Sequence, residues 1–161
     1  MARTGRYSDV DWDPSEMDDK VGDMQHRSDN FKPVFREMKD YLEDAWAGNF
    51  LSNGLRVGGW QPLDAKYASW KAVRYPGAQP LVQTGELFRS IRNLNSADVE
   101  IGDREASFGT SIEYAKFHQY GTSKMPKREI IFQPEDFERK WGELTARFIA
   151  DGDTGLNATA I

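Results

Sequence analysis

The segment 114–132, YAKFHQYGTSKMPKREIIF, most constrains the fold because helix formers, helix breakers and strand formers follow one another within it. Tyr114, Phe117 and His118 are spaced three and four residues apart, so a helix would place them on one face. Gly121 is typical of the left-handed residue that ends a helix at little steric cost. We therefore predict a short aromatic helix that stops at Gly121.

The second half of this segment predicts a loop followed by a strand. Pro126 cannot continue a helix and favours an extended backbone at Met125. The β-branched and aromatic run 130–132 is typical of a strand, and Pro134 closes it. Because the intervening loop 124–128 is rich in Lys and Arg, we interpret the segment as a contact surface rather than an active site.

The rest of the chain has room for one globular domain. With 161 residues, 39% hydrophobic and 29% charged, it fits a soluble protein with one core and polar tails. No apolar run approaches the ~20 residues that span a bilayer, and no secretory signal is expected. The absence of cysteine excludes disulfides and thiolate sites. A net charge of −5 argues against nucleic acid as the partner of the whole surface.

Residues 1–30 carry most of the net charge, with eight acidic and four basic side chains. Segments of this composition are commonly disordered, because they bury too little apolar surface to offset their ordering entropy. We predict an extended acidic arm and hypothesise that it wraps a neighbouring subunit, with Tyr7, Trp12 and Met17 as anchors. The main domain is expected at 31–150, and a short polar tail at 151–161.

Apolar spacing predicts four further helices in the main domain. They are expected at 31–46 with a stop at Gly48, at 62–74, from an N-cap at Thr84, and from Pro134 onward. Period-two alternation predicts a hairpin of 99–101 and 106–108, and a short hairpin is also expected around Asn53-Gly54. These elements make an α+β domain: a small antiparallel sheet flanked by helices, with an extended N-terminal arm.

Two smaller expectations concern packing. The helical spacing of Trp60, Tyr67 and Trp70 favours the core over an interface. Gly142 lies inside the last helix, where glycine is unfavourable, so it indicates close packing.

The sequence lacks the motifs of common catalytic and cofactor sites. Its only histidines, His26 and His118, are too far apart for a paired-ligand motif. A metal-dependent hydrolase built on Glu113, His118 and Glu129 is an alternative, but one imidazole with scattered carboxylates is more often structural. We expect no enzyme, no cofactor and no metal.

A nucleic-acid-binding module that uses the basic loop 124–128 is a second alternative. The footprint would consist of Arg89, Arg92, Lys124, Lys127 and Arg128. So few charges make a weak, salt-sensitive phosphate site, and an acidic protein surface would suit them equally well.

Several short motifs occur in one order between residues 60 and 132. They are WQPL at 60–63, Tyr67, Trp70-Lys71, Leu81, TGEL at 84–87, Ser90-Ile91, Tyr114-Ala115, HQYG at 118–121 and PKR at 126–128. In this order the chain resembles the phage virion morphogenesis family, the Mu-like tail-completion proteins of tailed phages. It is similar, more loosely, to the wider head–tail joining and tail-terminator proteins.

The resemblance implies a structural virion protein of the neck or tail, without catalytic residues. It implies a homo-oligomeric ring, usually sixfold, assembled in the host cytoplasm, that joins the tail to the DNA-filled head. The implied partners are a head-side connector or adaptor and the tail tube or other neck proteins; genomic DNA would pass through without specific binding, and no membrane is involved. Tail completion, tail termination and head–tail connection all stay open, because the acidic arm is not part of the family pattern.

A closed ring requires a patch on each subunit and a complement on the next. We predict one patch at the end of the aromatic helix and in the basic loop, with the Gly-rich loop 48–59 or the arm as its complement. The candidate interface residues are His118, Gln119, Tyr120, Lys124, Met125, Lys127, Arg128, Tyr7 and Trp12.

Overall fold

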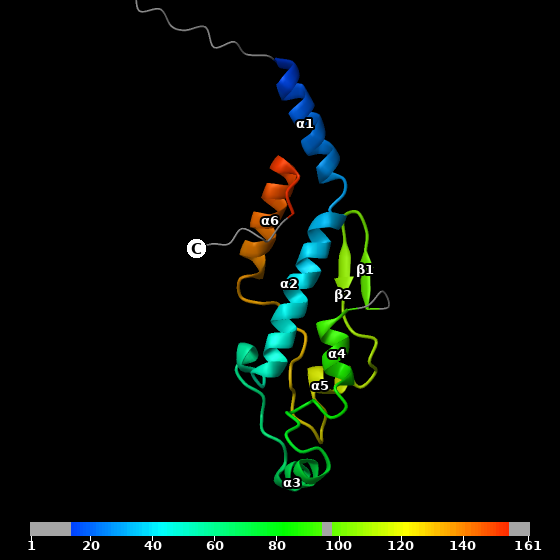
Figure 1. The fold of residues 1–161 in the computed structure, drawn as a ribbon, viewed down its shortest axis with the longest axis vertical. Coiled ribbons are helices and arrows are strands. Elements are labelled where there is room, and N and C mark those ends of the chain that lie inside the picture. Colours follow the sequence, from blue (N-terminus) through cyan, green and yellow to red (C-terminus); the bar gives the residue numbers. More distant parts are fainter. Residues whose placement is uncertain (1–13, 95–97, 155–161) are drawn as a thin grey trace, which may run out of the picture.

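The computed structural model describes residues 14–94 and 98–154. In chain order the elements are α1 (Pro14–Ser28), α2 (Lys32–Leu51), the 3₁₀ helix η1 (Leu55–Val57), α3 (Ala65–Arg74), α4 (Glu86–Arg92), β1 (Val99–Ile101), β2 (Ala106–Phe108), α5 (Ala115–Tyr120) and α6 (Phe137–Asp151). The elements are helices and a two-stranded antiparallel sheet that lies beside α2, which confirms the α+β class (Figure 1).

Helix α2 runs along the middle of the molecule and contributes to two separate hydrophobic clusters (Figure 1). Its N-terminal half packs Val34 and Met38 against α6, where Leu144 and Phe148 are buried. Its C-terminal half packs against α4 and the segment around residue 130. The apolar residues that recur along α2 therefore contribute to two clusters, one at each end of the helix.

The predicted hairpin is confirmed with its register. Strands β1 and β2 pair antiparallel, with Val99 opposite Phe108 and Ile101 opposite Ala106. The turn is tied to the start of α2, because the Phe31 amide donates to the Asp103 carbonyl at 2.7 Å.

The predicted extended arm is wrong for the part that the structure describes. Residues 14–28 form helix α1, which packs on α6 and is joined to it where Arg27 Nη1 donates to the Ala150 carbonyl at 3.2 Å. Residues 1–13, and with them Tyr7 and Trp12, lie outside the described residues, as do 155–161 of the tail. Met17 is 51% exposed and contributes to no core.

Helix α2 does not stop at Gly48, and no hairpin forms around Asn53-Gly54. The helix ends at Leu51, after which Asn53 (φ 54°) and Gly54 (φ 82°) reverse the chain into η1. A Cβ on Gly54 would lie 2.2 Å from Trp60 Cδ1, so only glycine fits beneath that ring. The Asn53-Gly54 pair correctly predicted a chain reversal, but the reversal joins α2 to a 3₁₀ helix and is not a β-hairpin.

Three helices begin later than predicted. Asp64 caps α3, so this helix begins at Ala65 rather than at residue 62. Gly85, not Thr84, is the N-cap of α4, and α6 begins at Phe137 after its N-cap Asp136. A Cβ on Gly142 would have no described atom within 4 Å apart from the backbone of its own helix, so the predicted close packing is wrong.

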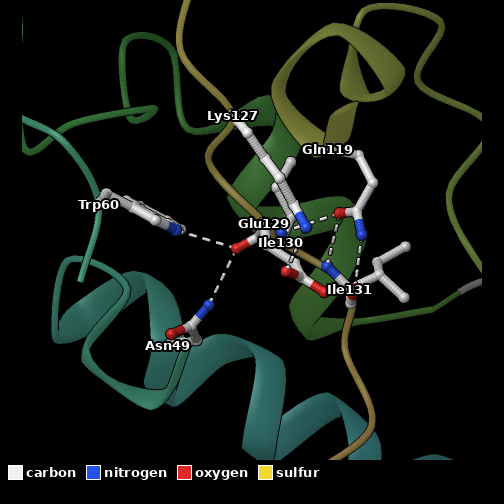
Figure 2. A network of polar contacts seen from close by, with 7 residues as sticks. All are labelled: Asn49, Trp60, Gln119, Lys127, Glu129, Ile130 and Ile131. Atoms are coloured by element: carbon white, nitrogen blue, oxygen red, sulfur yellow. Dashed lines mark hydrogen bonds and ion pairs between the residues drawn. The ribbon is translucent and has the colours of Figure 1, made fainter. Parts of the chain in front are cut away.

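The predicted strand at 130–132 is also wrong, since no β-ladder of the described residues includes it. The side chain of Gln119 takes the place of a neighbouring strand (Figure 2). Its Oε1 accepts from the amides of Ile130 at 2.9 Å and Ile131 at 3.0 Å, and its Nε2 donates to the Ile131 carbonyl at 2.7 Å. The β-branched run is therefore bonded to a helix rather than to a sheet.

Three further side chains hold the same run in place. The Glu129 carbonyl accepts from Asn49 Nδ2 at 3.1 Å and from Trp60 Nε1 at 2.9 Å (Figure 2). Trp46 Nε1 donates to the Phe132 carbonyl at 2.8 Å. Buried carbonyls that have no ladder partner are thus satisfied from α2 and from the loop that follows it.

Candidate interaction surface

A groove with a volume of about 940 Å³ lies between α3, the start of α4, α5 and the loop 122–126. Its walls are largely apolar and aromatic, with Leu63, Tyr67, Leu87, Phe117, Met125 and Pro126 among the lining residues. A groove of this size and character is typical of a binding site rather than of a packing defect.

Helix α3 turns its aromatic side chains outward. Tyr67 and Trp70 are 42% and 49% exposed, and their rings stack with centroids 5.5 Å apart. The prediction that they belong to the core is wrong for both, whereas Trp60 is half-buried and packs edge-on against Phe50. Among the residues of α3 only Lys71 is buried.

Gly121 sets the path of the chain from α5 into the loop. Its φ of 75° confirms the need for glycine, but its ψ of 177° is not that of the predicted left-handed cap. A Cβ there would lie 2.8 Å from the Lys127 amide nitrogen. The tight return closes the loop, with paired backbone bonds between Thr122 and Met125 and a bond from the Arg128 amide to the His118 carbonyl at 2.8 Å.

Arg128 is not the exposed contact residue that the basic loop predicted. Its side chain is only 4% exposed, and it donates from Nε to the Gln61 carbonyl at 3.0 Å and from Nη2 to the Pro62 carbonyl at 3.1 Å. These bonds fasten the loop to the segment before α3. Arg128 is therefore a structural residue at the base of the groove.

His118 lines the groove from α5 and is half-buried. Its Nδ1 is buried and has no hydrogen-bond partner among the described residues, and its ring packs edge-on against Tyr114 with centroids 6.2 Å apart. Burial lowers the pKa of His118, and the Arg128 guanidinium lowers it further. The described residues hold no group of three metal-ligating side chains, so Glu113, His118 and Glu129 are not brought together as a metal site.

The remaining candidates divide between interior and surface. Gln119 turns inward to Ile131, so it stabilises the fold. Tyr120 is 79% exposed, Lys124 is exposed, and Met125 lines the groove half-buried. Lys127 is exposed and pairs with Glu129 at 2.8 Å (Figure 2).

The footprint expected for nucleic acid is correspondingly reduced. Arg128 is buried and Lys127 is ion-paired, which leaves Lys124 in the loop, with Arg89 and Arg92 exposed on α4. Three scattered cations neutralise few phosphates, so these residues make a weaker nucleic-acid footprint than the sequence predicted.

A model of the phage virion morphogenesis family matches residues 13–145, most of the chain. The chain belongs to this family. No curated protein and no solved structure matched it. The match extends on both sides of the motifs between residues 60 and 132 and includes α1, so this helix is part of the family region.

Membership in the phage virion morphogenesis family assigns the chain to virion formation, a structural role. Among the described residues no helix is both long and apolar enough to cross a bilayer. Lys71 is one of the groove residues that the sequence-based site prediction did not include. A signal was present, because Lys71 lies four residues after Tyr67, on the same face of α3.

Proposed function

We propose that this protein is a non-enzymatic structural component of the phage neck or tail that assembles as a ring. The ring, with sixfold symmetry, joins the tail to the DNA-filled head as a tail-completion, tail-terminator or connector protein. Membership in the virion morphogenesis family supports the structural role. The proposal that the subunits form a ring is based on the side chains exposed at the surface of the subunit.

The observation that carries the proposal is the concentration of exposed aromatic side chains at the groove. Tyr67, Tyr114 and Phe117 are 42%, 40% and 46% exposed, and all three line the groove. Contiguous exposed apolar surface in a water-soluble subunit marks an interaction site, and aromatic residues are enriched where interfaces carry binding energy.

A ring also requires a complementary patch on a different face of the subunit. Helix α1 offers one, since Met17, Val21 and Met24 recur at helical spacing and are exposed. A second lies in the loop 48–59, where Leu55 is exposed. Helix α1 and α3 stand at opposite ends of the molecule, which suits head-to-tail contacts between neighbours (Figure 1).

Native mass spectrometry and electron microscopy of the full chain test this proposal. We expect closed rings for the unmodified protein and folded monomers for the double variant Tyr67→Ser/Phe117→Ser, because both side chains are exposed in the subunit. Val73→Ser is the matched control, since Val73 is exposed on α3 but does not line the groove. A chain that stays monomeric at every concentration, or a double variant with intact rings, contradicts the proposal.

A further inference from the structure

Two buried cations lie at the base of the groove without a carboxylate partner. Lys71 and Arg128 are each 4% exposed, and both line the groove. Lys71 Nζ donates to the Gln79 carbonyl, and Arg128 donates to two backbone carbonyls. Neither forms an ion pair with any carboxylate in residues 14–94 or 98–154.

Burial of an uncompensated charge is unfavourable, and two such charges close together are more so. Burial lowers the pKa of Lys71, and the nearby Arg128 lowers it further. The other charged or titratable residues that line the groove are Asp64, Tyr67, Glu86, Tyr114, His118 and Lys124.

Neither acid of the groove is free to neutralise the two cations. Asp64 accepts the amides of Lys66 and Tyr67 as the N-cap of α3. Glu86 lies beside Tyr114, whose pKa is raised by burial and by the Glu86 carboxylate. The base of the groove therefore favours an anion supplied from outside the subunit.

The walls of the groove indicate that its ligand also carries apolar groups. Their apolar and aromatic side chains enclose a volume of about 940 Å³, which is room for several residues of a peptide. The matching ligand carries carboxylates on one side and large apolar side chains on the other.

We propose that the groove binds the acidic segment 9–13 of a second copy of this chain. The sequence there is Asp9-Val10-Asp11-Trp12-Asp13. In an extended peptide successive side chains alternate, so three carboxylates face Lys71 and Arg128 while Val10 and Trp12 face the apolar walls. This inference rests on the proposed self-assembly and names the contact that carries it.

The reach of the chain requires that the segment come from another copy. Residues 9–13 directly precede α1, so they lie within about 18 Å of Pro14 even when fully extended. Helices α1 and α2 are about 22 Å and 30 Å long and follow each other end to end, with α3 beyond the far end of α2 (Figure 1). The groove of the same subunit is out of reach.

Photo-crosslinking within the assembled full chain tests the contact directly. Benzoylphenylalanine is placed at position 12, and chains of light and heavy isotope composition are mixed before assembly. We expect crosslinks between light and heavy chains, from position 12 to Tyr67, Phe117 or Met125. Rings whose crosslinks fall outside the groove overturn the inference and leave the ring proposal intact; a chain that stays monomeric overturns both.

Charge removal gives an independent measurement. Asp9→Asn/Asp11→Asn/Asp13→Asn should weaken association on the order of 30-fold, because the buried cations lose their partners. The matched control Asp44→Asn/Glu100→Gln/Glu105→Gln removes the same charge from exposed positions outside the groove, α1 and the loop 48–59, and should change association less than about 3-fold. Equal effects of the two triple variants would overturn the inference.

A change on the groove side completes the test. Lys71→Met removes one buried charge and keeps the apolar stem, so circular dichroism should show a folded subunit. It should weaken association of the unmodified arm on the order of 10-fold, and it should add little to the triple change of Asp9, Asp11 and Asp13. If the losses of association from the two changes were additive, residues 9–13 and Lys71 would not contact each other, which would overturn the inference.

Discussion

The side-chain amide of Gln119 bonds both backbone groups of Ile131, donating to the carbonyl at 2.7 Å and accepting from the amide at 3.0 Å (Figure 2). It presents a donor and an acceptor side by side, as the backbone of an adjacent strand does. Through this pair α5 is fixed to the buried run that contains Ile130. Gln119 therefore helps to hold the groove wall formed by α5, together with the bond from the Arg128 amide to the His118 carbonyl.

Replacement of Gln119 should be among the more costly changes in the chain. Gln119→Leu removes three hydrogen bonds and leaves the Ile130 amide, which is buried, without a partner, so we expect a loss of about 3 kcal/mol. Urea unfolding measures it. Gln133→Leu, at an exposed position whose amide bonds only Glu138, should change stability by less than about 0.5 kcal/mol.

The neighbours Lys127 and Arg128 should differ sharply when each is replaced by alanine. Arg128→Ala loses two bonds to backbone carbonyls and the packing of a buried stem, at a cost of about 2 kcal/mol. Lys127→Ala loses one exposed ion pair and should cost less than about 0.5 kcal/mol. Equal thermal unfolding of the two variants would contradict the structural role of Arg128.

Alanine should have opposite effects at two glycines. Gly121→Ala places a Cβ 2.8 Å from the Lys127 amide nitrogen at positive φ, so the loop must shift and we expect a loss of at least about 2 kcal/mol. Gly142→Ala meets open space inside α6 and should gain about 0.5–1 kcal/mol. Chemical denaturation of both variants measures the signs.

Stability should fall in mild acid because of His118. Its pKa in the folded chain is below the ordinary value of 6.5, so the unfolded chain binds the proton more readily. Neutral His118 therefore contributes fully to the free energy of unfolding above pH 6.5, the pKa in the unfolded chain. This contribution is lost as the pH falls from 6.5 through the pKa in the folded chain. Urea midpoints at pH 8 and pH 5 should differ less for His118→Gln than for the unmodified chain. His26→Gln, at an exposed position of α1, is the control.

Sequence patterns predicted the elements whose contacts lie close together in the chain. Period-two alternation predicted the hairpin of 99–101 and 106–108, and apolar spacing predicted a helix after Thr84, which is α4 with Leu87 and Ile91 buried. The run 130–132 was misassigned because β-branched residues favour a strand backbone but do not specify its partner. Here the partner is the side chain of Gln119, which bonds residues eleven and twelve positions later.

The candidate site was harder to predict, because periodicity shows that a helix has an apolar face but not what covers it. Tyr67 and Trp70 satisfy the pattern of a core helix and yet face outward. Arg128 was misjudged for the converse reason. Its charge indicated the surface, whereas its bonds to Gln61 and Pro62 draw it inside, and those bonds depend on contacts far along the chain.

Helix α2 is shared by two clusters that have no buried side chain in common. If the final turns of α6 come loose, Val34 and Met38 lose their cover, while Trp46 and Phe50 at the other end keep theirs. Loosening at the α6 end would thus leave in place the cluster that contains Leu87 and supports the groove.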